Sequence, residues 1–128
     1  MKITQFTDFS IRLLIYLSRH RDRVVTVREV AEYYVISAEH LKKIVRSLAE
    51  LGHVQTVRGK HGGLRLAREP SDIALGELFR QQENLALLPC HEPCDTCPIV
   101  ECRLRRLVDD ALAAFLGVFD GKTLADVI

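Results

Sequence analysis

The sequence predicts a mostly α-helical fold with one small β-hairpin: a winged helix-turn-helix followed by a long C-terminal helix. Three observations predict it. Two helical segments lead into a longer one, a glycine-rich hairpin follows, and an amphipathic stretch closes the chain. We expect the winged helix-turn-helix domain over residues 1–83, a cysteine-bearing loop over 84–102, and the final helix with a short tail over 103–128.

The first two helices are predicted from capping residues and apolar spacing. Thr7 is expected to cap a helix over 8–20, and the broad apolar face of that helix indicates packing in the core. Thr26 and Glu29 fit the Ser/Thr-x-x-Glu capping box, which predicts a short helix over 27–34.

A longer helix and a hairpin complete the predicted domain. Ser37 is expected to cap the helix over 37–51, which carries one apolar stripe of Leu41, Ile44, Val45 and Leu48. Segments 54–57 and 64–67 are typical of strands. Three glycines within 58–63 permit a tight reversal between them.

The second half of the chain predicts two more helices around an irregular segment. A fourth helix is expected over about 74–82, and three prolines indicate irregular structure over 84–102. A final helix is expected over about 101–119. Its apolar residues recur at spacings of three and four, and they are Leu104, Leu107, Val108, Ala111, Leu112, Phe115 and Leu116.

The net charge of +1 conceals an asymmetry between the two parts of the chain. Residues 1–70 hold 13 Lys and Arg against 7 Asp and Glu, whereas residues 71–128 hold 5 against 10. A basic part suggests a polyanionic partner such as nucleic acid. The apolar runs are too short to cross a membrane, and the N-terminus lacks a signal-peptide core, so we expect no membrane partner and a cytoplasmic location.

The predicted third helix and hairpin form a candidate reader of double-stranded DNA. A helix of this size fits the major groove, and the hairpin adds cations that reach phosphates. If the helix is considered alone, the alternative is that its polar residues simply form the solvent-exposed face of an amphipathic helix. Glu39 fits poorly, because a carboxylate repels phosphate unless it accepts from a cytosine amino group. The candidate DNA contacts are Ser37, Glu39, His40, Lys42, Lys43, Arg46, Arg58, Lys60 and Arg65.

The cysteines gather in one short segment, at Cys90, Cys94, Cys97 and Cys102. A cytoplasmic chain rarely uses such a group for structural disulfides, so a metal, an iron–sulfur cluster or a redox switch is favoured. Zinc in a four-cysteine tetrahedron and a two-thiol switch at Cys94 and Cys97 both stay open. A thiol–disulfide enzyme is disfavoured, because the Cys-x-x-Cys pair lacks the strand–Cys-x-x-Cys–helix context and the sequence shows no evident substrate pocket. We therefore expect a protein that is not an enzyme.

Several stretches resemble one known family. They are Ile-Thr-x-Phe-Thr-Asp at 3–8, Ser-x-x-His-Leu-x-Lys-Ile at 37–44, Val-Arg-Gly-Lys-x-Gly-Gly-x-Arg-Leu-Ala at 57–67, and the closing Thr-Leu-Ala-Asp at 123–126. With the cysteine segment, they resemble the bacterial iron–sulfur winged-helix regulators that include NsrR, IscR and RirA. The first and last stretches are most similar to the nitric-oxide-responsive NsrR type.

The resemblance implies a homodimer in which the long C-terminal helices of two chains pack together. The helix over 37–51 (the reader helix) and the hairpin over 54–67 (the wing) of each chain would then meet half of a palindromic operator. The apolar stripe of the final helix suits such packing. The alternative is burial of that stripe within its own chain.

The resemblance also implies an iron–sulfur cluster, [4Fe-4S] or [2Fe-2S], held by three cysteines and one other group. The positions that match are Cys90, Cys97 and Cys102. Family members commonly have five residues between the last two cysteines, whereas four separate them here. Cys94 is additional, and it could replace one of the three, act as the fourth ligand or stay free.

The fourth ligand has several candidates. Asp8 matches an acidic residue that NsrR-like members supply from the partner chain, although its alternative role is to favour the positive end of the first helix. Arg105 stands where IscR-like members have a ligating histidine, which argues against that mode. His91 remains a candidate, although a surface histidine is the more usual meaning.

Together with these observations, the resemblance implies a transcriptional repressor whose operator binding is controlled by an iron–sulfur cluster that senses nitric oxide. Alternatives within the same architecture are sensing of iron, cluster supply or redox state. A zinc-stabilised winged-helix interaction module is the alternative from another functional class.

Overall fold

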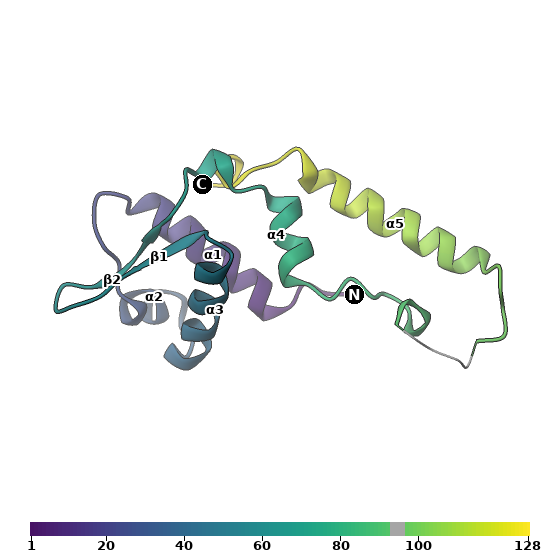
Figure 1. Ribbon diagram of the computed structural model, residues 1–128, viewed down its shortest axis with the longest axis horizontal. Helices are drawn as coiled ribbons and strands as arrows, with labels where there is room; N and C mark the ends of the chain where they lie inside the picture. The colour runs from purple at the N-terminus through teal and green to yellow at the C-terminus, as the bar shows by residue number, and fades with distance from the viewer. Residues whose placement is uncertain (93–96) are drawn as a thin grey trace.

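The computed structural model describes residues 1–92 and 97–128 (Figure 1). Within these ranges the elements follow the predicted order of a winged helix-turn-helix and a long final helix. They are α1 (Gln5–Arg19), α2 (Val27–Tyr34), α3 (Ala38–Glu50), β1 (Val54–Val57), β2 (Gly63–Leu66), the 3₁₀ turn η1 (Pro70–Asp72), α4 (Leu75–Gln82), η2 (Pro89–His91), α5 (Arg103–Asp120) and η3 (Leu124–Asp126).

The first helix begins three residues earlier than the sequence predicts. Its N-cap is Thr4, whose hydroxyl accepts a hydrogen bond from Thr7 N at 3.3 Å. Thr4 is itself held by Glu83, whose carboxylate accepts from the Thr4 backbone N–H at 2.7 Å and from its hydroxyl at 2.9 Å. Thr7 lies inside α1 and is fully buried, so the expectation that it caps this helix is wrong.

The two helices of the helix-turn-helix begin at the predicted caps. Thr26 accepts from Glu29 N at 3.1 Å, and Ser37 accepts from His40 N at 3.1 Å. Between the helices, Val35 ends α2 in the left-handed conformation with φ 55°. Only glycine and, less often, Asn or Asp adopt this region readily, so the turn between α2 and α3 is strained.

The predicted hairpin is antiparallel, with Val54 opposite Leu66 and Val57 opposite Gly63, and its second strand begins one residue earlier than expected. A third piece of chain pairs with it, because Val25 N donates to Leu64 O at 2.9 Å and Leu64 N donates to Val25 O at 2.6 Å. A side chain on Gly63 would collide with the Val25 backbone. Glycine at this position therefore permits the close approach that ties the wing to the domain.

The core lies among the first three helices and the base of the hairpin. Six of its large side chains are within one per cent of complete burial, and they are Leu13, Leu14, Leu17, Leu41, Ile44 and Leu48. The stripe predicted along the third helix is therefore its buried face. This packing leaves the opposite face of α3 toward solvent.

The long helix α5 is fastened to the rest of the chain at its C-terminal end. Phe79 of α4 packs against Phe115 and Phe119, with ring centroids 6.1 and 4.6 Å away. Beyond the helix, Leu124 N donates to Ile73 O at 2.9 Å. The N-terminal part of α5 extends away from the winged helix-turn-helix (Figure 1). In the part of the chain that the structure describes, no helix has the length and apolarity of a membrane span.

Candidate nucleic-acid interface and cysteine segment

The outer face of α3 exposes the predicted cations. Lys42 and Arg46 are 61% and 83% exposed, and Lys43 is exposed as well. Lys42 Nζ lies 3.2 Å from the Glu39 carboxylate, and Arg46 Nε lies 3.3 Å from Glu50. Glu39 thus has a partner one turn along its own helix. A loose exposed pair of this kind is worth less than about 1 kcal/mol, so Lys42 can exchange it for a phosphate.

His40 lies differently from the sequence expectation. Its ring packs edge-on against Phe6 and Phe9 of α1, with centroid distances of 6.3 and 6.0 Å, and its Nε2 is buried. The expectation that His40 stands on the outer face with the cations is therefore wrong. Its neighbours are residues of α1, which sequence spacing along α3 does not reveal.

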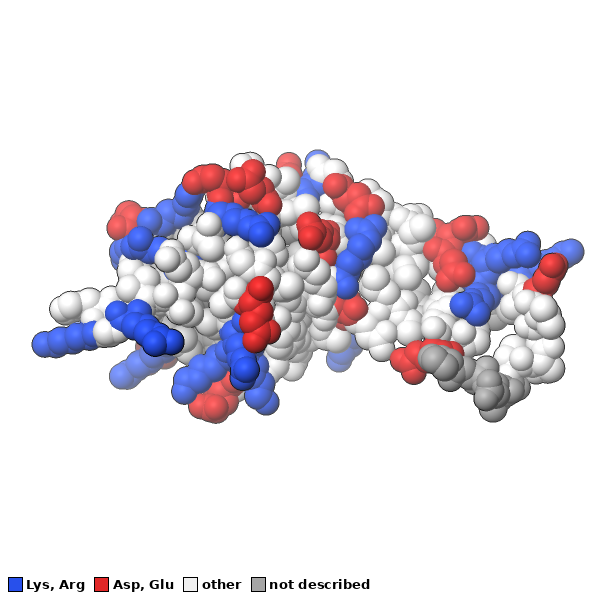
Figure 2. Space-filling model, in the orientation of Figure 1, with Lys and Arg blue, Asp and Glu red and all other residues white. Residues whose placement is uncertain are grey.

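The hairpin supplies a second set of cations beside α3. Arg58, Lys60 and Arg65 are exposed, and none forms an ion pair within the described ranges 1–92 and 97–128. Figure 2 shows Lys and Arg side chains projecting from the end of the molecule that carries the wing. Unpaired cations lose no internal contact when they meet phosphate, so they favour a polyanionic partner.

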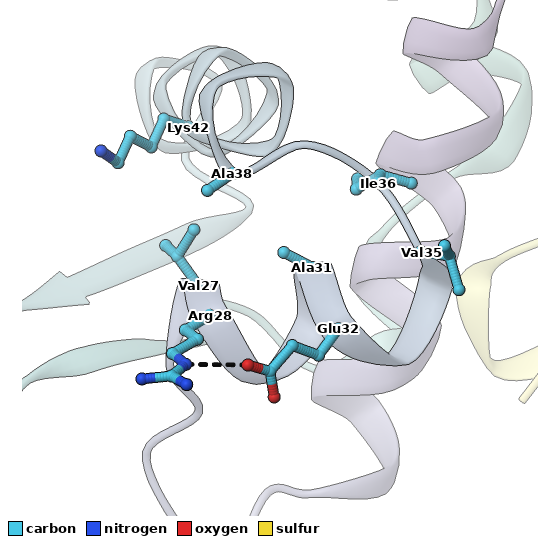
Figure 3. Close-up of a pocket in the computed structure, with 8 residues that line it drawn as sticks. All are labelled: Val27, Arg28, Ala31, Glu32, Val35, Ile36, Ala38 and Lys42. Atoms are coloured by element: carbon cyan, nitrogen blue, oxygen red, sulfur yellow. Dashed lines mark hydrogen bonds and ion pairs between the residues drawn. The ribbon is translucent and has the colours of Figure 1, made fainter.

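An apolar groove of about 830 Å³ opens between α2 and the start of α3 (Figure 3). Val27, Ala31 and Ala38 face one another across it. At its rim stand Lys42 and Arg28, the second paired with Glu32 at 2.8 Å. Sequence reasoning singled out neither Arg28 nor this groove. An apolar surface between cations suits a sugar edge or a thymine methyl group.

The described cysteines are free thiols in different surroundings. Cys97 is exposed, whereas Cys90 in η2 and Cys102 are half-buried. Cys102 is the N-cap of α5, and its Sγ accepts from Arg105 N at 3.4 Å. The positive end of a helix dipole suits an anionic sulfur ligand. Cys94 falls within 93–96, outside the described residues.

The donor chemistry fits a soft metal centre, because three thiols occur on one short segment. Within 1–92 and 97–128, however, no three His, Cys, Asp or Glu side chains form a common metal-binding group. The structure therefore does not bring Cys90, Cys97 and Cys102 together. Asp8 lies on α1, where both its oxygens accept from Arg12 Nε at 2.9 Å.

Comparisons with known proteins settle the family. The family model of Rrf2, described as an iron-dependent transcriptional regulator, matches residues 3–128. The chain belongs to the Rrf2 family. The HTH-type transcriptional regulators NsrR of Shouchella clausii (strain KSM-K16) and Bacillus subtilis (strain 168) are 40% and 38% identical to it. Each alignment covers this whole chain, with 89% and 90% of the respective relative.

Solved structures of Rrf2-type regulators have the same fold. IscR of T. potens has a TM-score of 0.81 and 25% identity, covering 99% of this chain and 85% of its own. CymR, the global cysteine regulator of B. subtilis, has a TM-score of 0.78 and 26% identity, covering 99% and 95%. The predicted winged-helix fold is confirmed. The chain is a transcriptional regulator and not an enzyme, as the sequence predicts.

Two features of this Rrf2 chain were missed or misjudged from sequence. Arg12, the partner of Asp8, stands four residues further along α1, and this helical spacing is a signal that could have found it. His91 is not a surface histidine, because its side chain is only 10% exposed. Its Nε2 lies 3.1 Å from the carboxylate of Asp109 in α5, eighteen positions away, and no local pattern reveals that contact.

Proposed function

We propose that this Rrf2-family chain is a DNA-binding repressor whose operator binding depends on an iron–sulfur cluster and is relieved by nitric oxide. The observation that carries the proposal is that Cys102 caps α5 with its thiol. A change of ligand at this sulfur acts directly on the first turn of the helix. The Rrf2 description as iron-dependent and the relatives named NsrR support the same reading.

DNA binding would use α3 and the wing together. Lys43 and the wing cations are unpaired among the described residues, and Lys42 and Arg46 form only exposed pairs. Each phosphate that such a side chain neutralises contributes about −0.9 to the slope of log affinity against log salt. Ser37 and the groove beside Ala38 lie at the N-terminal end of α3, the part of a reader helix that meets base edges.

The proposed active form is a homodimer on a palindromic operator. Leu104 and Leu107, at the N-terminal end of α5, are 60% and 66% exposed in the single chain, and Val118 is 68% exposed. Leu116, near the fastened end, is 5% exposed. The alternative that the whole stripe is buried within its own chain therefore loses support. A second α5 would remove these side chains from water at about 25 cal/mol for each Å² buried.

Cys90, Cys97 and Cys102 are the proposed cluster ligands, with Asp8 of the partner subunit as the fourth. When bound, the cluster would supply iron that reacts with nitric oxide, together with cross-links between the three cysteines. Cys102 would transmit their loss to α5 through its contact with Arg105 N. Asp8 would connect the same event to α1, because its ligation requires it to leave Arg12. Cys94 is a proposed substitute ligand.

The proposal is tested on protein purified without oxygen. Iron and acid-labile sulfide are measured first, and the operator is selected from random duplexes with the loaded dimer. Nitric oxide is then titrated while visible absorbance and operator affinity are followed together. We expect affinity to fall as the absorbance is lost. Unchanged affinity after complete loss of the cluster would overturn the mechanism, and stoichiometric zinc would overturn the cofactor.

A second candidate function is the same architecture with another signal, such as iron, cluster supply or redox state. One observation favours it. CymR, named as a cysteine regulator, has the same fold with 26% identity, so the fold is not restricted to one signal. Single Cys→Ser variants separate the candidates, since a redox switch needs two of the thiols whereas the cluster needs all of its ligands.

A further inference from the structure

His91 follows Cys90 directly in η2, and its imidazole is turned inward. The side chain is 10% exposed, although the segment around it is at the surface. Histidine is seldom buried without partners, because each ring nitrogen requires a hydrogen bond. The groups that contact the two ring nitrogens therefore indicate the role of the His91 side chain.

The contacts of Nδ1 fix the tautomer of the neutral ring. Nδ1 lies 3.1 Å from Leu87 N and 3.3 Å from Leu88 N, and both are backbone N–H donors. A nitrogen that accepts from two donors carries no proton of its own. The hydrogen of the neutral imidazole is therefore on Nε2. The same contacts close a turn that fixes Cys90, because His91 N also donates to Leu88 O at 2.9 Å.

The other nitrogen faces α5. His91 Nε2 lies 3.1 Å from Asp109 Oδ1, and it has no well-aligned hydrogen bond to any described residue. Asp109 is 52% exposed, so its carboxylate is free to rotate toward the N–H group. The His91 ring thus connects the backbone beside Cys90 to the middle of α5. Two backbone donors already occupy the lone pair of Nδ1, so that nitrogen is not free for a metal.

We propose that His91 is a positioning residue that holds Cys90 against α5 and passes movement of Cys90 to that helix through Asp109. The inference rests on the proposed function, because it takes Cys90 as a cluster ligand and α5 as the dimer helix. The contact itself exists without a cluster. It therefore has a test that requires neither metal nor DNA.

The first test uses the full-length metal-free protein. Asp109→Asn is compared with Asp110→Asn, which removes the same charge from the next residue of α5. Alkylation of Cys90 by iodoacetamide is followed by peptide mass spectrometry, with exposed Cys97 as the internal reference. We expect Asp109→Asn to raise the Cys90 to Cys97 rate ratio about fivefold, because a neutral amide attracts the Nε2–H group less strongly than a carboxylate does. Equal effects of the two variants would overturn the proposal.

Two histidine variants separate the functions of the two nitrogens. His91→Asn keeps an acceptor for the Leu87 and Leu88 N–H groups but is too short to reach Asp109. We expect it to reproduce Asp109→Asn, and the double variant to add nothing further. Additive effects would mean that the residues act independently, which contradicts the link. Nitrogen-15 spectra should identify the Nε2–H tautomer, and an Nδ1–H tautomer would contradict the assignment.

A last comparison separates this inference from the proposed function. The ratio of operator affinities of loaded and metal-free dimer is measured for the parent protein and for Asp109→Asn. We expect the variant to reduce that ratio, whereas Asp110→Asn preserves it. An unchanged ratio would reject transmission through His91 while the repressor mechanism stands. If the parent protein binds no cluster, the proposed repressor mechanism is wrong. The alkylation experiment would still test the contact between His91 and Asp109.

Discussion

Asp8 and Arg12 are joined on α1 by two hydrogen bonds from one guanidinium nitrogen, each 2.9 Å long. The two side chains are 45% and 50% exposed, so the pair contributes only a few tenths of a kcal/mol to stability. The carboxylate proposed as the partner subunit's ligand is therefore held lightly in place. Displacing Arg12 costs little compared with forming a metal–ligand bond.

The first prediction follows from this competition. Asp8→Ala should shorten the lifetime of the cluster in air, and Arg12→Gln should lengthen it about twofold, because Asp8 is then released. Loss of the visible absorbance of loaded protein measures both. Arg28→Gln is the control, since Arg28 forms an equivalent pair with Glu32 on α2. An unchanged lifetime in Asp8→Ala would exclude Asp8 as a ligand.

A second prediction concerns Glu29, which joins α2 to α1. The Arg23 guanidinium, and then the Tyr16 hydroxyl at 2.6 Å, lower the pKa of Glu29 from 4.5 to about 2. Its contribution to stability is therefore complete above pH 4.5 and is lost as the pH falls toward 2. Glu29→Gln should cost about 1 kcal/mol at pH 7 in urea unfolding and much less at pH 2, where about half of the Glu29 carboxyl groups are protonated in the folded protein. Exposed Glu32→Gln should show no such pH dependence.

A third prediction concerns His53, at the junction of α3 and the wing. It is 4% exposed, neither ring nitrogen has a hydrogen-bond partner among the described residues, and burial lowers its pKa below 6.5. Gln81 and Glu77 of α4 and Arg68 after β2 are the polar groups that act on it. Protonation is therefore disfavoured in the folded state, and stability should decline as the pH falls below 6.5.

The measurement for His53 is urea unfolding at pH 7.5 and pH 5.5. His53→Gln should make the difference between the two values smaller than in the parent protein. His61→Gln at the exposed wing tip provides the control and should leave the difference unchanged. A parent protein equally stable at both pH values would contradict the assignment.

A fourth prediction uses the strained turn between the helices of the helix-turn-helix. Val35 has φ 55° and is 90% exposed, so its side chain gains little from packing. Val35→Asn should stabilise the protein by about 1 kcal/mol, since Asn tolerates the left-handed region. Val35→Gly should gain less, because glycine adds entropy to the unfolded chain. Thermal unfolding of the three proteins checks the order.

A fifth prediction addresses the wing. Lys60→Ala and Arg58→Ala should each weaken DNA binding and reduce the salt slope of log affinity by about 0.9, the contribution of one phosphate contact. Arg21→Ala is the control, because Arg21 is already paired with Glu69 at 2.7 Å. An unchanged slope in both wing variants would show that the wing does not meet the phosphate backbone.

The sequence predicts the local structure better than the contacts between distant segments. Thr26 and Ser37 cap the expected helices because capping depends on residues three positions apart. The cap of α1 was misassigned because Thr4 is held by Glu83, which is 79 residues away. The ring of His40 lies inward for a similar reason, since the position of α1 against α3 is a property of the folded domain.

The candidate site divides in the same way. Exposed cations on α3 and the wing follow from helical spacing and from the hairpin, so their exposure could be predicted. The contact between His91 and Asp109 joins an irregular segment to a helix, and no periodicity encodes it. Sequence spacing also does not show whether the three thiols assemble into one site. In the single chain, the described residues do not form such a site.

Two hydrogen bonds fasten the C-terminal end of α5, from Leu124 N to Ile73 O and from Leu75 N to Lys122 O. The helix can therefore pivot about this end, which lies beside α4. The helix has 18 residues between this fastened end and Cys102 at its N-terminus, a length of about 27 Å at 1.5 Å per residue. A tilt of about 5° then displaces the far end by about 2 Å. Small changes at Cys102 are thus geometrically equivalent to slight rotations at the base of the DNA-reading domain.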